Sequence, residues 1–283
     1  MKKKVILFFL TLMARFPMSI LYVFSDIIYL ILYYGLSYRK SVVRKNISES
    51  FPEKSLKEIK VIEKQFYHHL GDMMVETIKL LHISDSEMKK LITVRNYESV
   101  NKTLSEKKNV VMLLGHYGNW EYVQEIKRYF LSESYMATIY HPPKKKVWDD
   151  IFLQIRSRWD NHMLAMRKAP KILLNKNNMP WVCGFIADQR PSKNMADNHL
   201  MFLNHDTTFI YGPEEIGVKV GSDFFYLEMT RIKRGHYTIT FHKLDPKDLD
   251  QPFPYTREFW RKFEKTIENS PAFWLWSHKR WKK

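Results

Sequence analysis

The sequence predicts an α/β protein in which helices flank a central sheet, preceded by an apolar helix at the N-terminus. Segments with strand-like and helix-like patterns alternate along most of the chain, and residues 5–38 form an apolar and aromatic stretch. No internal repeat, low-complexity tract or linker divides the remainder. Such alternation is typical of a sheet covered on both faces. We therefore expect a membrane anchor over residues 1–40 and a single α/β domain over residues 41–283.

The N-terminal apolar stretch predicts a retained membrane anchor. Residues 18–36 approach the roughly 20 residues that a helix needs to span hydrocarbon. A carboxylate is costly inside a bilayer, so we expect Asp26 to be neutral, paired, for instance with Arg15, or placed at the interface. The stretch is too long for a cleaved signal and lacks a small-residue cleavage site. Because basic residues flank both ends, the positive-inside rule does not give the topology.

The next segment, residues 55–81, has the apolar spacing of a helix that covers one face of a core. His68 and Asp72 lie one helical turn apart on it and have the spacing of a metal-binding pair. A third ligand is not evident, so we expect ordinary polar contacts for both side chains.

The soluble part then contains the predicted sheet and its helices. The apolar run at residues 110–114 predicts a buried strand. Further strands are expected at residues 135–140, 181–186, 223–230 and 237–242. Helices are expected at residues 147–158, 213–220 and 256–268.

A Gly-His-Tyr-Gly-Asn-Trp-Glu segment follows the strand at residues 110–114 and opens a helix-like stretch that reaches residue 130. This order places His116 at the carboxyl end of a strand, where open α/β sheets bind ligands. Glu121 would lie in the first helical turn and orient the imidazole. The spacing alone is weak, since chance yields about one such pair in this composition. The second pair, His82 and Glu87, lies in an ordinary helix cap, so its spacing is interpreted as structural.

Composition limits the partners. The chain has 46 Lys and Arg residues against 30 Asp and Glu residues, a formal net charge of +16, and such a surface attracts polyanions. The apolar N-terminus favours an anionic membrane surface over nucleic acid, which we do not expect as a partner. The single cysteine, Cys183, excludes an internal disulfide and is expected to be a buried apolar side chain.

Several familiar chemistries leave no motif in the sequence. It contains no Gly-x-Ser-x-Gly elbow, no Walker loop, no Gly-x-Gly-x-x-Gly and no Cys-x-x-Cys. Serine hydrolases, nucleotide hydrolases and dinucleotide enzymes are therefore disfavoured. Histidines and aspartates in residues 197–206 match no zinc signature, so we expect a solvated loop there. We expect neither a metal nor a cofactor.

The C-terminal residues 270–283 combine three tryptophans with four basic residues. Two interpretations stay open. Indole and basic side chains suit the lipid headgroup layer, whereas a terminal helix could instead dock its tryptophans in the core.

The chain as a whole resembles the bacterial lipid A biosynthesis (lauroyl/myristoyl) acyltransferases of the lysophospholipid acyltransferase superfamily. The segments that carry the resemblance are the apolar anchor, residues 44–46 and 51–53, the His116 and Glu121 motif, the Asp188-Gln189 pair and the tail at residues 274–282. Arg190-Pro191-Ser192 and His141 depart from the family pattern, which leaves the acceptor open.

The resemblance implies a glycerolphosphate-acyltransferase fold and an O-acyltransferase. The acyl chain would move from acyl carrier protein or coenzyme A to a hydroxyl of a lipid A precursor or related glycolipid. An aminolipid acceptor is the alternative, and a membrane-anchored thioesterase or a non-catalytic binding protein are rival classes. The implied location is the bacterial inner membrane, with the catalytic domain on the cytoplasmic side.

The chemistry expected of these residues is general base catalysis. His116 would take the proton of the acceptor hydroxyl as its oxygen attacks the thioester carbonyl, with no enzyme nucleophile. The backbone amides of residues 118–120 and the side chain of Arg156 are candidate donors to the oxyanion. Asn119, Arg156 and Asp188 are expected to bind substrate, although Asp188 would also be explained as a carboxylate that ends a strand.

Overall fold

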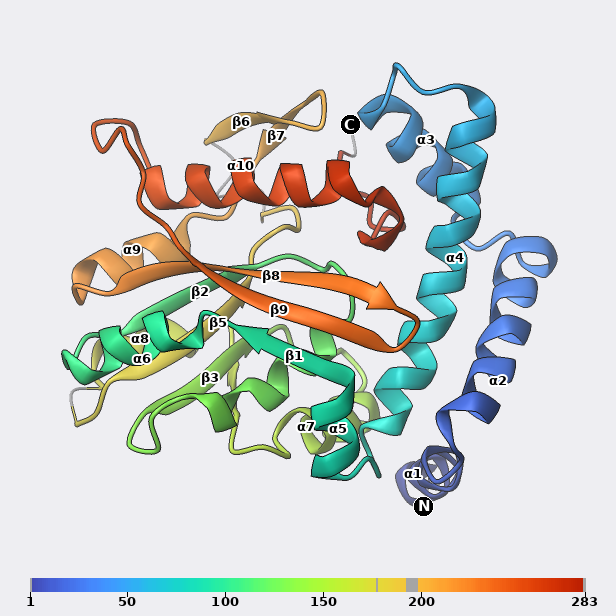
Figure 1. The fold of residues 1–283 in the computed structure, drawn as a ribbon, viewed down its shortest axis with the longest axis horizontal. Coiled ribbons are helices and arrows are strands. Elements are labelled where there is room, and N and C mark those ends of the chain that lie inside the picture. The colour runs from blue at the N-terminus through green and yellow to red at the C-terminus, as the bar shows by residue number, and fades with distance from the viewer. Residues whose placement is uncertain (1, 177, 192–197, 282–283) are drawn as a thin grey trace.

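A seven-stranded sheet forms the centre of the computed structural model, which describes residues 2–176, 178–191 and 198–281 (Figure 1). Its strand order is β1-β9-β8-β2-β5-β3-β4. Strands β8, β2, β5, β3 and β4 run parallel, whereas β9 is antiparallel to β8 and β1 is parallel to β9. The strands are β1 (Ile92–Arg95), β2 (Val110–Leu114), β3 (Tyr135–Tyr140), β4 (His162–Ala165), β5 (Trp181–Ile186), β8 (Asp223–Lys233) and β9 (His236–Lys243).

Helices flank the sheet, so the predicted α/β class is confirmed (Figure 1). All the expected helices form, and the sequence analysis missed β1, β4, α3, α6 and α8. The α-helices are α1 (Lys2–Ala14), α2 (Met18–Leu30), α3 (Lys40–Ser50), α4 (Leu56–Lys79), α5 (Asp85–Leu91), α6 (Tyr97–Ser105), α7 (Lys146–Arg156), α8 (Ala169–Leu174), α9 (Gly212–Lys219) and α10 (Pro254–Asn269). A π-helical turn, η1 (Ile31–Gly35), and two 3-10 helices, η2 (Trp120–Tyr129) and η4 (Pro271–Phe273), complete the set.

Strand β2 lies between two hydrophobic clusters. All five of its residues are buried, because a central parallel strand has helices over both faces. Val111 and Leu113 join one cluster, which contains α9 and α10 side chains. Val110, Met112 and Leu114 join the other, which contains side chains of α6, η2 and α7. The expected buried cysteine, Cys183 on β5, is fully buried as well.

Helix α4 runs along the edge of the sheet toward which β8 points (Figure 1). It begins with a capping box, in which the Ser55 side chain accepts from the Glu58 amide and the Glu58 carboxylate accepts from the Ser55 amide. Helix α4 buries polar groups as well as apolar ones. The buried polar residues are Glu63, His69, Asp72, Glu76 and Lys79.

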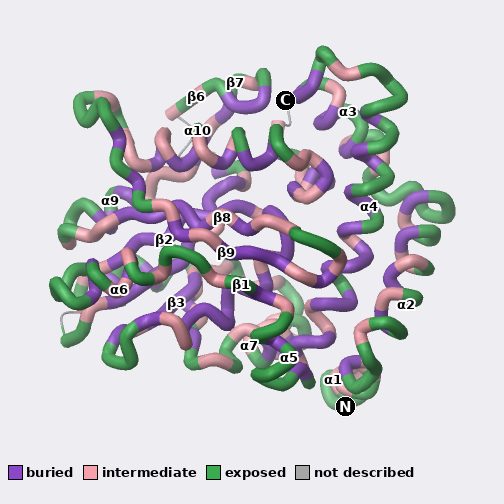
Figure 2. The backbone as a smooth tube through the Cα atoms, viewed as in Figure 1, coloured by how far each residue is buried: buried purple, intermediate pink, exposed green. Residues whose placement is uncertain are grey.

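The apolar N-terminal segment lies on the outside of α4. Met18–Gly35 is, by length and composition, long and apolar enough to cross a membrane, and 22% of it is buried. Exposed residues alternate with more buried ones along α2 (Figure 2). The suggested pairing of Asp26 with Arg15 is wrong: Asp26 binds Arg234, whose Nη2 lies 2.6 Å from Oδ1. Arg234 lies at the turn between β8 and β9, which the fold brings against α2.

The C-terminal tryptophans dock in the core, although they do so from an irregular segment and not from a helix. Trp274 is 4% exposed and Trp276 is fully buried. Trp281 stacks on His205, with ring centroids 3.8 Å apart. Lys282 and Lys283 lie outside the described residues.

The segment expected to be a solvated loop forms a hairpin. Strand β6 (His199–Phe202) pairs with β7 (His205–Thr208), and His199 Nδ1 lies 3.1 Å from Asp206 Oδ1. Phe202 anchors the hairpin, since it is buried in the cluster that holds Trp260 and Trp274. Ser192 and Asp197 lie outside the described residues.

Helix α9 packs closely on the sheet at Gly217, and a substitution there tests the packing between them. A Cβ added at Gly217 would lie 2.5 Å from Phe224 Cζ and 2.8 Å from Val111 Cγ2. We expect Gly217→Ala to lower the free energy of unfolding by about 1–3 kcal/mol, because overpacked cores must shift. Gly212 on the same helix is the control, since an added Cβ there meets no described atom within 4 Å. Urea unfolding in detergent measures both variants, and equal midpoints would contradict the packing.

Candidate active site

His116 and Asp188 form a tight pair at the carboxyl edge of the sheet. His116 Nδ1 lies 2.6 Å from Asp188 Oδ1, and the His116 backbone amide donates to Oδ2 over 3.0 Å. Trp274 Nε1 donates to the same Oδ2 over 2.8 Å. Asp188 is 2% exposed, and burial favours its neutral form. The attraction of His116 and these hydrogen bonds nevertheless hold the pKa of Asp188 below its usual value.

The pairing of β2 with β5 explains why these two residues meet. In the parallel register Leu114 faces Ile186, and the Ala187 amide donates to the Leu114 carbonyl over 2.9 Å. His116 and Asp188 each follow these facing residues by two positions, so they leave the sheet side by side. The position of Asp188 directly after a predicted strand is the signal that sequence analysis had for this role.

Glu121 does not hold His116, which corrects the prediction made from the His-x₄-Glu spacing. Its carboxylate forms a two-point contact with Arg156, with Nε to Oε2 at 2.8 Å and Nη2 to Oε1 at 2.5 Å. The Glu121 and Arg156 side chains are only 6% and 19% exposed. The planar guanidinium of α7 matches the carboxylate at the start of η2, whereas Asp188 already occupies Nδ1 of the imidazole. Both charges of this pair are therefore engaged within the protein.

The second imidazole nitrogen faces the edge of the site. Gln189 Nε2 lies 3.3 Å from His116 Nε2. The Trp120 ring packs edge-on against the imidazole, with ring centroids 4.9 Å apart. The His116 side chain is 17% exposed. Because the carboxylate of Asp188 accepts a proton from Nδ1, the neutral imidazole has its lone pair on Nε2. That nitrogen can accept a proton from a bound molecule.

The loop that carries His116 is fixed from two sides. The Gly118 amide donates to the Phe273 carbonyl over 3.0 Å, so this amide is not available as the oxyanion donor that the sequence suggested. The Gly118 carbonyl contacts His69 Nε2 at 3.1 Å. His69 is buried against Arg231, and burial followed by this positive neighbour lowers the pKa of its imidazole to about 3. A neutral His69 therefore donates to the loop.

Asn119 lies beneath the loop and is fully buried. Its Nδ2 donates to Glu76 Oε2 over 2.7 Å, and its Oδ1 accepts from the Glu121 amide over 3.2 Å. Tyr237 and Tyr22 also donate to Glu76, each over 2.9 Å. Asn119 thus holds the loop in place through α4 and does not face the surface, where we expected it to bind substrate. Sequence analysis gave no sign of Glu76.

Asp72 makes the polar contacts expected of it, and His68 Nδ1 lies 3.9 Å from Asp26 Oδ1. Asp72 accepts from Ser25, Arg231 and Arg234 over 2.6–2.9 Å. His68 stacks on the Tyr29 ring with centroids 3.5 Å apart.

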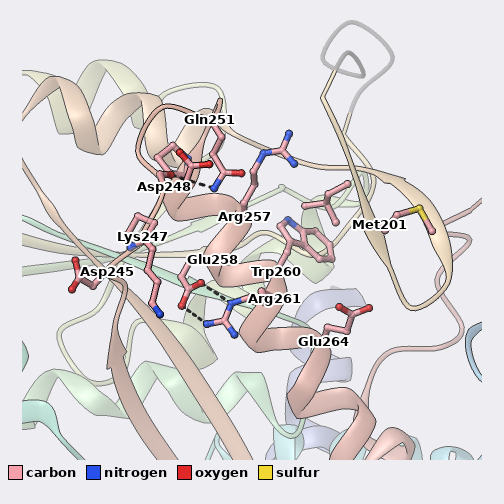
Figure 3. Close-up of a pocket in the computed structure, with 13 residues that line it drawn as sticks. Met201, Asp245, Lys247, Asp248, Gln251, Arg257, Glu258, Trp260, Arg261 and Glu264 are labelled. Atoms are coloured by element: carbon pink, nitrogen blue, oxygen red, sulfur yellow. Dashed lines mark hydrogen bonds and ion pairs between the residues drawn. The ribbon is translucent and has the colours of Figure 1, made fainter.

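Two cavities lie near the C-terminal half of the fold. A void of about 10 Å³ lies behind the loop that carries His116, among apolar and aromatic side chains that include Leu114, Tyr117, Trp120 and Phe263. A surface pocket of about 520 Å³ lies between α10, β6 and the β9–α10 segment (Figure 3). Charges of both signs line this pocket, among them the paired Glu258 and Arg261, and its described walls include none of the predicted site residues. The pocket is therefore separate from the His116 site.

The buried ion pair of Glu121 predicts a strong and specific loss of stability. We expect Glu121→Ala to lower the free energy of unfolding by about 3 kcal/mol, because it leaves the Arg156 guanidinium without a counter-charge. Glu121→Ala combined with Arg156→Met should lose less than the sum of the single losses, as urea unfolding in detergent would show. Glu106→Ala is the control, since Glu106 and its partner Lys108 are 44% and 49% exposed and solvent screens their attraction, so its loss should be small. Additive losses would contradict a coupled pair.

Glu76 predicts a pH dependence of stability. Burial is the main cause that raises the pKa of its carboxyl group from 4.5 to about 7, against the opposing effect of its hydrogen-bond donors. The folded protein thus binds this proton more tightly than the unfolded chain does. The contribution of Glu76 to the free energy of unfolding is largest below pH 4.5 and falls by about 3 kcal/mol as pH rises toward 7. The free energies of unfolding of the wild type and of Glu76→Gln, measured across this pH range, should converge or cross. Two parallel curves would contradict the raised pKa of Glu76.

The chain matches a family model and two known proteins. The family model described as bacterial lipid A biosynthesis acyltransferase matches residues 3–283. Over 253 residues the chain is 22% identical to the lipid A biosynthesis palmitoleoyltransferase of Escherichia coli (strain K12). This match covers 87% of this chain and 80% of that protein. The lipid A biosynthesis acyltransferase of Shigella flexneri matches with the same identity and coverage.

The matched region includes the β2 loop with His116, the Asp188 segment after β5 and the C-terminal Trp274 segment. It also confirms the resemblance that the sequence motifs suggested. The chain therefore belongs to the family of bacterial lipid A biosynthesis acyltransferases, and it is an acyltransferase enzyme.

Proposed function

We propose that this enzyme transfers a fatty acyl chain from an acyl thioester to a hydroxyl of a lipid A precursor, with His116 as general base and Asp188 as the carboxylate that orients it. The observation that carries the proposal is the 2.6 Å contact between His116 Nδ1 and Asp188, which leaves Nε2 directed away from the carboxylate. Family membership supports acyl transfer to a lipid A precursor. The role given to Glu121 by its spacing passes to Asp188.

The proposed reaction begins at Nε2 of His116. The acceptor hydroxyl replaces the Gln189 amide as the donor to this nitrogen, with the amide still beside it, and loses its proton as its oxygen attacks the thioester carbonyl. Asp188 stabilises the imidazolium that forms, and the hydrogen bonds from Trp274 and the His116 amide keep that carboxylate in place. The imidazolium then returns the proton to the sulfur as the thiol leaves. No acyl-enzyme intermediate is needed.

The charge on the tetrahedral oxygen requires a donor close to His116. Two of the donors expected from the sequence are engaged elsewhere, since Arg156 binds Glu121 and the Gly118 amide binds Phe273. The Gln189 carboxamide lies 3.3 Å from Nε2, within reach of an oxygen bonded to the same carbon as the attacking hydroxyl. We assign this donor role to Gln189. Arg156 then acts by bracing the start of η2 against α7.

The remaining parts of the proposal concern the donor and the location. The donor is acyl carrier protein or coenzyme A, and a chain with a formal charge of +16 suits either of these anionic carriers. No metal or further cofactor enters the reaction. The enzyme resides at the bacterial inner membrane, with residues 1–40 as its anchor and residues 41–283 as a domain of the glycerolphosphate-acyltransferase type on the cytoplasmic side. An aminolipid is the alternative acceptor.

The test measures acyl transfer in purified membranes from labelled acyl carrier protein to a lipid A precursor. We expect His116→Ala to lower the rate by about a hundredfold or more, because the hydroxyl loses its base. Asp188→Asn should cause a loss of similar size, since the imidazole then loses its orienting charge. His82→Ala is the matched control, because it removes the other histidine of a His-x₄-Glu pair, and it should keep the wild-type rate.

Three outcomes would overturn the proposal. Full activity of His116→Ala excludes that imidazole as the base. Full activity of Asp188→Asn, with loss of activity in a stably folded Glu121→Gln variant, returns the orienting role to Glu121. Release of free fatty acid in place of an acylated lipid identifies a thioesterase, which mass spectrometry of the lipid products distinguishes directly.

A further inference from the structure

The face of α1 and α2 that points away from the domain carries large apolar side chains and no described protein partner. On α2 and η1 the exposed apolar residues are Ile20, Val23, Phe24, Ile27, Leu30, Ile31 and Tyr34. On α1 and the turn after it they are Val5, Phe8, Phe9, Leu12 and Phe16. Contiguous exposed apolar surface of this kind marks an interaction site. Exposed basic residues at its borders, Lys4, Arg15 and Arg39, favour a negatively charged partner.

The opposite face of α2 is fixed to α4 along its length by polar contacts. The Tyr22 hydroxyl donates to Glu76 Oε1 over 2.9 Å, and the Ser25 hydroxyl donates to Asp72 Oδ1 over 2.6 Å. The two helices approach so closely that a Cβ added at Gly71 would lie 2.8 Å from the Ser25 carbonyl oxygen. Glu76, Ser25 and Asp72 are almost completely buried. Separating the helices would leave these polar groups unpaired, which is costly.

The β8–β9 turn is fixed to the middle of α2. Arg234 binds Asp26 Oδ1 and Asp72 Oδ1, each over 2.6 Å. A Cβ added at Gly235 would lie 2.2 Å from the Tyr22 hydroxyl oxygen, so the turn rests on α2. If α2 crossed a bilayer, this charged turn would lie near the centre of the hydrocarbon. Irregular backbone exposed to lipid is excluded there, because its polar groups find no partners.

Helix length does not distinguish a crossing from an in-plane position. The 18 residues of Met18–Gly35 span about 27 Å at ~1.5 Å per residue, close to the thickness of the hydrocarbon layer. The arrangement of the helices does distinguish them. In Figure 1, α2 runs within the plane of the view while α1 is seen end-on, and both lie on the outer side of α4. A flat surface can therefore touch both apolar faces at once.

We infer that α1 and α2 lie flat in one leaflet of an anionic bilayer and that the chain does not cross it. This inference rests on the proposed membrane association and defines its form. The apolar faces insert roughly 5–10 Å, while α4 and the β8–β9 turn stay in the headgroup and aqueous layers. Both ends of the chain then lie on the same side of the membrane. The carboxyl edge of the sheet, with His116, faces the leaflet into which the helices insert.

Spin labels at Ile20→Cys, Val23→Cys, Ile27→Cys and Leu30→Cys test the depth of α2 in vesicles that contain phosphatidylglycerol. These four positions share one helix face, and the native Cys183 is fully buried, so the parent chain measures background labelling. We expect all four labels to report the same shallow depth. Leu249→Cys is the control, since this residue is 64% exposed in the β9–α10 segment on the far side of the molecule, and its label should report water.

Labelling from one face tests the topology. A membrane-impermeant maleimide added outside sealed vesicles should react with Lys4→Cys and Lys279→Cys together, or with neither. Reaction with only one of them, or a depth profile deepest near residue 27, would overturn the in-plane arrangement. Labels shielded from both lipid and water would also overturn it in favour of a second protein copy. Acyl transfer is measured on the same vesicles, so a crossing helix with full activity refutes this inference and leaves the proposed reaction standing.

Discussion

The site depends on the parallel, in-register pairing of β2 with β5. This pairing makes the two strands end together, so a histidine two residues beyond one strand meets an aspartate two residues beyond the other. A shift of one residue in either strand would turn one of these side chains to the opposite face of the sheet. The C-terminal segment then closes around the pair: Trp274 donates to Asp188, and the Leu275 amide donates to the His116 carbonyl over 3.1 Å. Residues from three distant parts of the chain thus build one dyad.

Helix α4 connects the His116 and Asp188 pair to the N-terminal helix α2. Its His69 holds the loop that carries His116 at Gly118, and its Glu76 holds Asn119 of the same loop. The other oxygen of Glu76 accepts from Tyr22 on α2. A buried carboxylate with donors from both sides is expensive to displace, so the position of α2 and that of the loop are coupled. The distance between α2 and His116 is therefore set by packed protein and not by a flexible tether.

Two carboxylates near His116 have different surroundings and different consequences. Asp188 contacts the imidazole and is stabilised as an anion by hydrogen bonds as well as by charge. Glu121, despite its place in the His-x₄-Glu motif, neutralises the half-buried guanidinium of Arg156. The His-x₄-Glu spacing thus shows only that both residues lie in one loop and the helix that follows it. His116 belongs to the pair with Asp188, whereas Glu121 joins η2 to α7. Equal formal charge does not imply an equal role, because each carboxylate acts on the group that it contacts.

Local patterns in the sequence determined the α/β class, the principal strands and helices, the apolar N-terminal segment and the position of His116 at a strand end. These features follow from apolar periodicity and from turn and cap residues, which act over a few positions. Strand order, by contrast, depends on packing between distant segments. Only the tertiary structure therefore decided that Asp188 meets His116, that Glu121 binds Arg156, that Asp26 binds Arg234 and that the tryptophans of the tail are buried. A charged side chain takes its partner from whatever the fold brings within a few ångströms, and sequence spacing does not contain that distance.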